Sequence, residues 1–120
     1  MNDQKYIIYG QTPSKSNCYR IIKHGAFSSL GKTAALKEYE DKFFIQCRHR
    51  DLNVSVRFRL DVDVYFKSDQ PDLDNSLKTI LDCLQQCRAI KNDRLCAVIY
   101  ARKFVDKANP RIEYSITPLQ

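Results

Sequence analysis

The chain has 120 residues, 43% of them hydrophobic, which is enough for one domain with a packed core. Its formal net charge is +6, from 20 basic and 14 acidic side chains. No apolar run is long enough to span a bilayer, and the start MNDQKYIIYG lacks the basic and apolar regions of a signal peptide. We therefore expect a single domain over residues 1–120, no membrane span, and a cytoplasmic location.

The charge is unevenly distributed along the chain. Residues 61–93 contain seven Asp and four Lys or Arg, a net charge of −3, whereas the other residues carry sixteen basic and seven acidic side chains, a net charge of +9. An acidic segment within a basic frame suits a metal-dependent enzyme acting on a polyanion, because cations attract phosphates and carboxylates hold the metal. A basic composition alone is weaker support, since many solvated surfaces are basic.

Five cysteines, at positions 18, 47, 83, 87 and 96, include no C-x-x-C pair, and neither histidine stands near Cys83 and Cys87 in sequence. Zinc sites need such ligand spacing, so we do not expect one. The pattern favours buried free thiols in a reducing compartment.

In chain order, Lys5–Tyr9 and Tyr19–Lys23 predict two short strands, separated by Gly10 and a loop over Gln11–Asn17. From composition alone, the second strand and its loop are typical of an ordinary exposed hairpin. Residues Ser28–Gly31 predict a further break in regular structure.

From Lys32 to about Arg48 the pattern is helical. Helical spacing favours core positions for the aromatic residues on its apolar face over stacking on nucleic-acid bases. Arg48, His49 and Arg50 would close the helix, where cations suit the negative end of the dipole. Contact with nucleic acid is the alternative role of these three residues. The expected apolar face comprises Ala35, Leu36, Tyr39, Phe43, Phe44 and Cys47.

Strict alternation over Asn53–Lys67 predicts a long strand with one apolar face, from Val54 to Phe66, and one polar face. Asp61 and Asp63 fall on the polar face, and we expect them to pair with neighbouring Arg or Lys rather than to bind metal. The strand leads directly into the next segment and would position it.

Residues 68–93 hold the candidate site. Asp72 and Asp74 follow a turn, and extended side chains two residues apart point the same way. Lys78 stands one helical turn after Asp74, and a short loop after the helix could return Asp93 to the first pair. Three converging carboxylates would repel unless a cation joined them, and few hard oxygen ligands with room for water and phosphate suit Mg²⁺. Lys78 could stabilise charge on a scissile phosphate or its leaving oxygen.

The same residues allow a structural interpretation. Asp72 and Asp74 could be loop residues that cap the helix, and Lys78 with Asp82 could be a surface i, i+4 pair. Spacing alone does not choose between these interpretations. The helix itself is predicted by an apolar stripe at Leu77, Ile80, Leu81, Leu84 and Cys87.

Two more strands, Leu95–Phe104 and Arg111–Thr117, flank a turn over Asp106–Pro110. The resulting order is β-β-α-β-α-β-β. We therefore expect an α/β (α+β) fold, with a mixed sheet of about five strands and two main helices.

The pattern D-x-D-N-x-x-K, followed fifteen residues after the Lys by an Asp in an I-x-N-D context, resembles the RusA family of Holliday-junction resolvases. Asn92 departs from that family, which usually has a second acid at this position. The resemblance implies catalysis by Asp72, Asp74, Lys78 and Asp93, with the three Asp residues holding Mg²⁺ or, as the alternative ion, Mn²⁺. In that interpretation Asn75 would organise the helix start. Asp82, one turn after Lys78, would orient the lysine, although a plain i, i+4 pair explains its position equally well.

The resemblance further implies a homodimer that acts on four-way junction DNA in a bacterium or phage. An N-terminal loop of the G-x-P-x-x-K kind lies near DNA in this family, which makes Lys15 and Arg20 candidate phosphate contacts. Two alternative functions remain open at this point. One is a DNA-binding module without catalysis, and the other is a different metal-dependent, structure-selective nuclease, such as a flap or RNA nuclease.

Overall fold

The computed structural model describes residues 4–14 and 18–119. The predicted α+β class and the predicted order of strands and helices are confirmed, with β3 as an additional strand. Within these ranges, no helix is long and apolar enough to cross a membrane. The elements are β1 (Tyr6–Tyr9), β2 (Tyr19–His24), β3 (Phe27–Lys32), α1 (Ala34–Gln46), β4 (Phe58–Phe66), α2 (Leu73–Gln86), the short 3₁₀ turn η2 (Asp93–Leu95), β5 (Cys96–Val105) and β6 (Arg111–Pro118).

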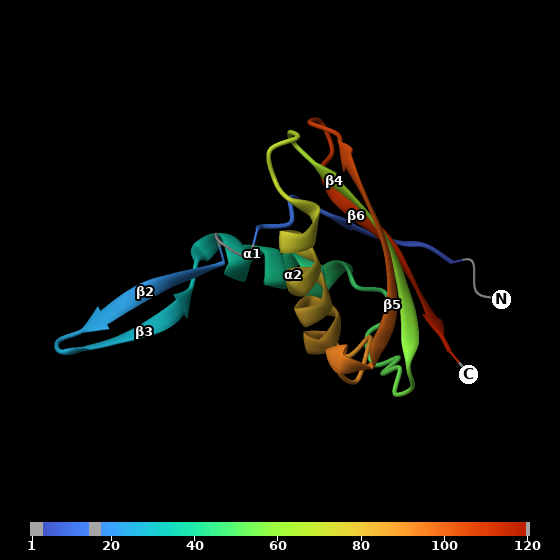
Figure 1. Ribbon diagram of the computed structural model, residues 1–120, viewed down its shortest axis with the longest axis horizontal. Coiled ribbons are helices and arrows are strands. Elements are labelled where there is room, and N and C mark those ends of the chain that lie inside the picture. Colours follow the sequence, from blue (N-terminus) through green and yellow to red (C-terminus); the bar gives the residue numbers. More distant parts are fainter. Residues whose placement is uncertain (1–3, 15–17, 120) are drawn as a thin grey trace.

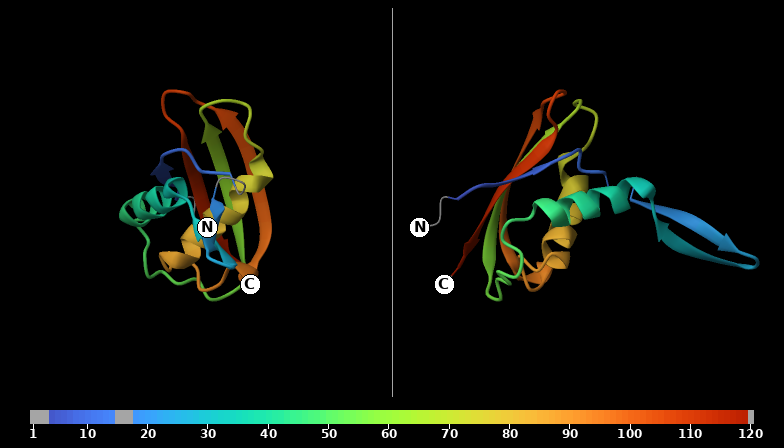
Figure 2. Two further views of the ribbon diagram at one scale, coloured as in Figure 1. Left: turned by 90° about the vertical axis from the view of Figure 1, so that its left-hand side faces the viewer. Right: turned by 180° about the vertical axis from the view of Figure 1, so that it is seen from behind.

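Four strands form one mixed sheet in the order β1-β6-β4-β5 (Figure 1). Strand β4 pairs in parallel with β5 and antiparallel with β6, which in turn pairs antiparallel with β1. Parallel neighbours need a crossover, and α2 provides it between β4 and β5. Both helices cover the same face of the sheet and leave the other face open (Figure 2).

The core lies between the sheet and the two helices. On β4 every second residue from Phe58 to Phe66 is buried, as the alternation predicts. The apolar stripe of α2 meets them with Ile80 and Leu84, both fully buried, and α1 contributes Phe43. Each such side chain contributes about 1.5–3 kcal/mol to folding. This packing fixes α2 against β4, the two elements that frame the candidate site.

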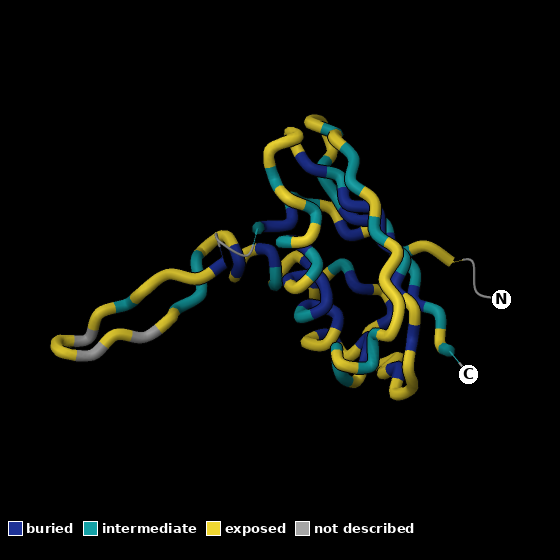
Figure 3. The backbone as a smooth tube through the Cα atoms, in the orientation of Figure 1, coloured by how far each residue is buried: buried dark blue, intermediate teal, exposed yellow. Residues whose placement is uncertain are grey.

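Strands β2 and β3 form a separate two-stranded ribbon, the arm, which projects beyond α1 away from the sheet (Figures 1 and 3). Ile21 and Leu30 pair across it and are 68% and 73% exposed. At Gly31 an added Cβ would meet the end of the Ile22 side chain, which would have to move to make room for it. The predicted break at Ser28–Gly31 is therefore wrong, because cross-strand pairing with β2 holds these residues extended.

The long predicted strand begins later than expected, at Phe58 rather than at Asn53. Asn53 has a positive φ of 52°, and its N–H donates to the Arg88 carbonyl, so this segment follows the loop after α2. Val54 forms an isolated parallel bridge with Ile90. The alternation of apolar and polar residues in the sequence already includes Val56, two residues before β4, but the Val56 side chain is exposed rather than in the core.

The first helix ends at Gln46, before the basic run that was expected to close it. His49 is instead buried in the core, where its Nε2 shares a 2.7 Å hydrogen bond with the Tyr114 hydroxyl. Phe44 is exposed and lies under the Arg50 guanidinium, and Ala35 is exposed as well. The rest of the expected apolar face of α1 is buried.

Candidate active site

The two carboxylates of the D-x-D pattern, Asp72 and Asp74, lie at the start of α2, just after the turn that follows β4. A turn over residues 67–71 connects the two elements, and Asp72 takes the N-cap position with an extended backbone. Its carboxylate makes no capping hydrogen bond and instead accepts a 3.4 Å bond from the Asn75 amide. Asp74 lies in the first turn of the helix, where negative charge suits the dipole. Asp72 and Asp74 are both exposed, so their oxygens are open to solvent.

The second group of site residues gathers around Lys78, one turn further along α2. Its ammonium nitrogen lies 2.9 Å from a carboxylate oxygen of Asp82 and 2.7 Å from one of Asp93. The hydrogen bond to Asp93, followed by that to Asp82, raises the pKa of Lys78 above its ordinary value. Lys78 is therefore a positively charged donor at any pH near neutrality.

The backbone after α2 explains how Asp93 returns to the helix. Arg88 adopts the left-handed conformation, with φ of 65°, directly after the C-cap Cys87, and thereby reverses the chain. The N–H of Asp93 then donates to the Gln85 side chain at 2.8 Å. Asn92 caps η2, because its side chain accepts from the N–H of Arg94. Asn92, which stands where the family usually has an acid, thus has a structural role: it caps the turn that contains Asp93.

Gln85 is a positioning residue that sequence reasoning missed. It stands on α2 two turns after Lys78, and it fixes the backbone of Asp93 through a side-chain hydrogen bond. No spacing rule relates Gln85 to Asp93, because the contact depends on how the chain returns after the helix.

The structure does not bring Asp72, Asp74 and Asp93 together as one cluster. Within residues 4–14 and 18–119, no group of three or more His, Cys, Asp or Glu side chains is placed to hold a metal ion. The donor chemistry nevertheless fits a hard divalent cation, since Asp72 and Asp74 offer exposed carboxylate oxygens that no basic side chain of residues 4–14 and 18–119 binds in an ion pair. Asp93 is already neutralised by Lys78.

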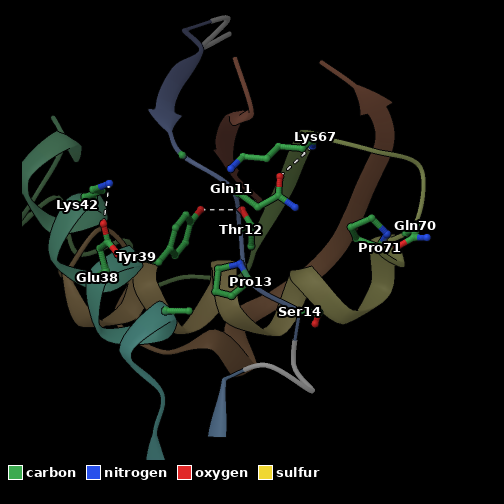
Figure 4. A pocket seen from close by; sticks show the side chains of 12 residues that line it. Gln11, Thr12, Pro13, Ser14, Glu38, Tyr39, Lys42, Lys67, Gln70 and Pro71 are labelled. Carbon is green, nitrogen blue, oxygen red and sulfur yellow. Dashed lines mark hydrogen bonds and ion pairs between the residues drawn. The ribbon is translucent and has the colours of Figure 1, made fainter. Parts of the chain in front are cut away.

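A hollow of about 590 Å³ adjoins the first turn of α2 (Figure 4). Its walls come from the loop over residues 10–14, from α1, and from the turn that ends at Pro71, next to Asp72. The Tyr39 hydroxyl shares a 2.8 Å hydrogen bond with Thr12, which fixes the loop to α1. Two lysines, Lys42 and Lys67, also line the hollow, and Lys42 pairs with a glutamate on α1. The hollow therefore lies beside the start of α2 and is lined by both basic and neutral polar side chains.

The root of the arm also borders the site. A smaller hollow of about 110 Å³ is lined by Tyr19, at the start of β2, together with Lys78 and Asp82. Arg20 follows on β2 with an exposed side chain. Lys15 lies outside the described residues. The arm thus leads from the neighbourhood of Lys78 outward, and Arg20 stands near its base.

Asp61 and Asp63 belong to the open face of the sheet, not to this site. Arg59 donates to the Asp61 carboxylate at 2.8 Å, and Arg102 binds Asp63 through two bonds of 2.9 Å. Lys5 lies 3.7 Å from Asp63. The expectation that these two acids pair with basic neighbours is confirmed.

Comparison with known proteins gives one result for nearly the whole chain. The family model described as endodeoxyribonuclease RusA matches residues 12–117. No curated protein matches the chain.

Proposed function

The chain belongs to the endodeoxyribonuclease RusA family, and we propose that it is a Mg²⁺-dependent endodeoxyribonuclease that resolves Holliday junctions by paired, symmetric nicks in DNA recombination and repair. The observation that carries the proposal is the Lys78–Asp93 contact of 2.7 Å, one helical turn from Asp74. It supplies a permanently protonated amine next to exposed carboxylates. Binding alone gives no reason to gather carboxylates near phosphate, so this arrangement favours catalysis over a passive DNA-binding module.

Asp72, Asp74 and Asp93 would hold Mg²⁺ or Mn²⁺, and the bound ion would supply an activated water and neutralise charge on the scissile phosphate. Lys78 would stabilise the charge that develops on the phosphate or its leaving oxygen. Asp82 would keep the Lys78 side chain oriented.

Asn75, through its hydrogen bond to Asp72, would hold that carboxylate at the start of α2. The adjoining hollow would receive the strand to be cut, with Lys67 near its backbone. Lys15 and Arg20 would contact phosphates further out, which agrees with the exposed position of Arg20 at the base of the arm. Such an enzyme would act in the cytoplasm of a bacterium or of a phage-infected cell.

We further propose a homodimer, because paired nicks in a four-way junction match two sites related by a two-fold axis. The exposed edge of β5 supports this assembly. Residues Val98, Ile99 and Tyr100 are all about half exposed there, and among the described strands β5 is the last of the sheet, with no strand paired to its outer edge. Antiparallel pairing of two β5 strands centred on Ile99 would set Ile99 against its own copy and Arg102 against Cys96, so the two copies of Arg102 would not face each other.

Cleavage of a labelled four-way junction in Mg²⁺ and in EDTA, by the wild type and by Asp74→Asn, tests the proposal. Symmetric nicks that require Mg²⁺ and disappear in Asp74→Asn, while junction binding persists, are the expected result. Asp41→Asn, which changes an exposed acid on α1, is the matched control and should cut normally.

Two other results would each replace the proposal. Binding without cleavage by the wild type, over a range of metals and junction sequences, would indicate a non-catalytic module. Equal cutting of linear DNA, flapped DNA or RNA would keep the metal site and indicate a different structure-selective nuclease.

A further inference from the structure

Two thiols from distant parts of the chain meet at the ends of the two helices. Cys47 is the C-cap of α1 and Cys87 is the C-cap of α2, and their sulfur atoms lie 2.9 Å apart. Both side chains are buried, at 2% exposure. A disulfide has a sulfur–sulfur distance of about 2.05 Å, so the two sulfur atoms need to approach by less than about 1 Å to bond.

The pair is chemically asymmetric. The hydrogen bond from Cys87, and secondarily the neighbouring His49, lower the pKa of Cys47. The same contact with Cys47, together with burial, raises the pKa of Cys87. Cys47 is therefore the sulfur of the pair that more readily forms a thiolate, and a thiolate is the species that attacks a disulfide.

The thiol pair also reaches a surface hollow. Cys47 and Cys87 line a hollow of about 690 Å³ together with three basic residues, Arg48, Arg50 and Arg88, and one acid, Asp51, which pairs with Arg88, so the charged lining is basic on balance. A cationic rim favours an anionic reactant. A small peptide disulfide that carries carboxylates, such as glutathione disulfide, combines this charge with an electrophilic sulfur.

We propose that Cys47 and Cys87 are a site of reversible thiol oxidation, at which an anionic low-molecular-weight disulfide converts them into a bond between the ends of α1 and α2. The Cys47 thiolate attacks one sulfur of the small disulfide, which forms a mixed disulfide and releases one small thiolate. The Cys87 sulfur then attacks the sulfur of Cys47 and displaces the second small thiolate, which takes up the Cys87 proton. Two protein thiols are oxidised, and the small disulfide is reduced to two thiols.

The remaining cysteines provide internal controls. Cys83 is buried, which raises the pKa of its thiol to about 12, and burial also raises the pKa of Cys96. Cys18 shares its sulfur contact with the Thr79 hydroxyl rather than with another cysteine. Within the described chain, the other three cysteines form no hydrogen bond with another thiol.

The test is to treat the whole chain with glutathione disulfide and count its free thiols after denaturation. The wild type should fall from five thiols to three, lose two hydrogen atoms in mass, and yield one cross-linked peptide joining residues 47 and 87. Dithiothreitol should reverse all three changes. Cys96→Ser should lose two of its four thiols in the same way.

Cys47→Ser and Cys87→Ser should form no internal cross-link, and Cys87→Ser should instead keep glutathione as a mixed disulfide on Cys47. Thermal unfolding provides a second readout, because oxidation should raise the midpoint of the wild type and not that of Cys87→Ser. An unchanged count of five thiols, or a cross-link between any other pair, would overturn the proposal. Cys47→Ala serves in place of Cys47→Ser if the latter does not fold.

Discussion

The ammonium nitrogen of Lys78 lies 2.7 Å from a carboxylate oxygen of Asp93, fifteen residues further along the chain. This contact ties α2 to the turn before β5, and it joins two residues of the proposed catalytic set. Asp93 holds the amine protonated, and the amine neutralises Asp93. In the proposed reaction, a bound metal would offer Asp93 a new counter-charge and a phosphate would offer one to Lys78, so the pair would rearrange at little electrostatic cost.

Replacing Lys78 with glutamine should therefore reduce the rate of junction cleavage without abolishing junction binding. Removal of one charge-stabilising donor costs about 10²–10³-fold in the rate of the chemical step. The measurement is single-turnover cleavage with enzyme in excess, accompanied by a gel-shift titration. Lys37→Gln, which changes an exposed lysine on α1, is the control and should cut at the wild-type rate. A Lys78→Gln enzyme as fast as the control would remove this residue from the chemistry.

Asp82 and Asp93 both contact Lys78, but they should differ in their effect on cleavage. Asp93 is a proposed metal ligand, so Asp93→Asn should lower the cleavage rate strongly and raise the Mg²⁺ concentration needed for the remaining activity. Asp82 only orients the lysine through an i, i+4 pair, which is worth about 0.3–0.5 kcal/mol. Asp82→Asn should lower the rate a few-fold at an unchanged Mg²⁺ requirement. Equal losses in the two variants would mean that both carboxylates act only through Lys78.

Much of this site follows from local sequence rules. The alternation of β4, the stripe of α2 and the D-x-D spacing together locate Asp72, Asp74 and Lys78, because each rule concerns residues within one or two helical turns. These rules do not predict which carboxylate forms the shortest ion pair with Lys78. Asp74 and Asp82 are equally spaced from it on the helix, yet the shortest contact is to Asp93, which arrives only because Arg88 reverses the chain.

Other features depended on contacts that no local pattern contains. The segment after Gly25 looks like a break because it is rich in serine and glycine, but pairing with β2 makes it the strand β3. Val56 continues the alternation of β4, but the bridge between Val54 and Ile90 redirects the chain before that strand begins. Cys47 and Cys87 are forty residues apart, and only the packing of both helices on one sheet face brings them together.

Arg20 on the arm should contribute to binding and not to chemistry. Arg20→Ala is expected to weaken junction binding and to reduce the salt dependence of the binding constant by about one unit of slope, as loss of one phosphate contact does. The maximal cleavage rate at saturating enzyme should not change. Lys15→Ala should behave in the same way. Binding measured over a series of salt concentrations is the test, and unchanged slopes would remove both residues from the DNA-binding surface.

Substitution of Ile99 by lysine should separate the proposed dimer. This side chain is 43% exposed on the free edge of β5, so a single chain tolerates the change, whereas a two-fold strand pair would bring two lysines together. The expected result is a monomer by sedimentation, with paired nicks replaced by single nicks or by no cleavage. Ile45→Lys changes a more exposed isoleucine on α1 and should leave the assembly intact. A dimer that survives Ile99→Lys would locate the interface elsewhere.

Asp63, on the open face of the sheet, should make stability depend on pH in the acid range. The Arg102 guanidinium, with a smaller effect of Lys5, holds the pKa of this carboxyl below its ordinary value of 3.8. A carboxyl with a lowered folded-state pKa stabilises the fold above its unfolded pKa, and this contribution is lost as the pH falls through the folded pKa. Asp63→Asn should therefore lower the free energy of unfolding by about 1–2 kcal/mol near neutral pH.

The loss from Asp63→Asn should shrink toward zero in strong acid, where the wild-type carboxyl is protonated as well. Urea unfolding of both proteins, at neutral pH and again below the ordinary carboxyl pKa, measures the two differences. Asp41→Asn removes an exposed acid from α1 and should change neither value. A loss for Asp63→Asn that stayed constant over this range would mean that shape and neutral hydrogen bonds, rather than the charge on Asp63, join β4 to β5.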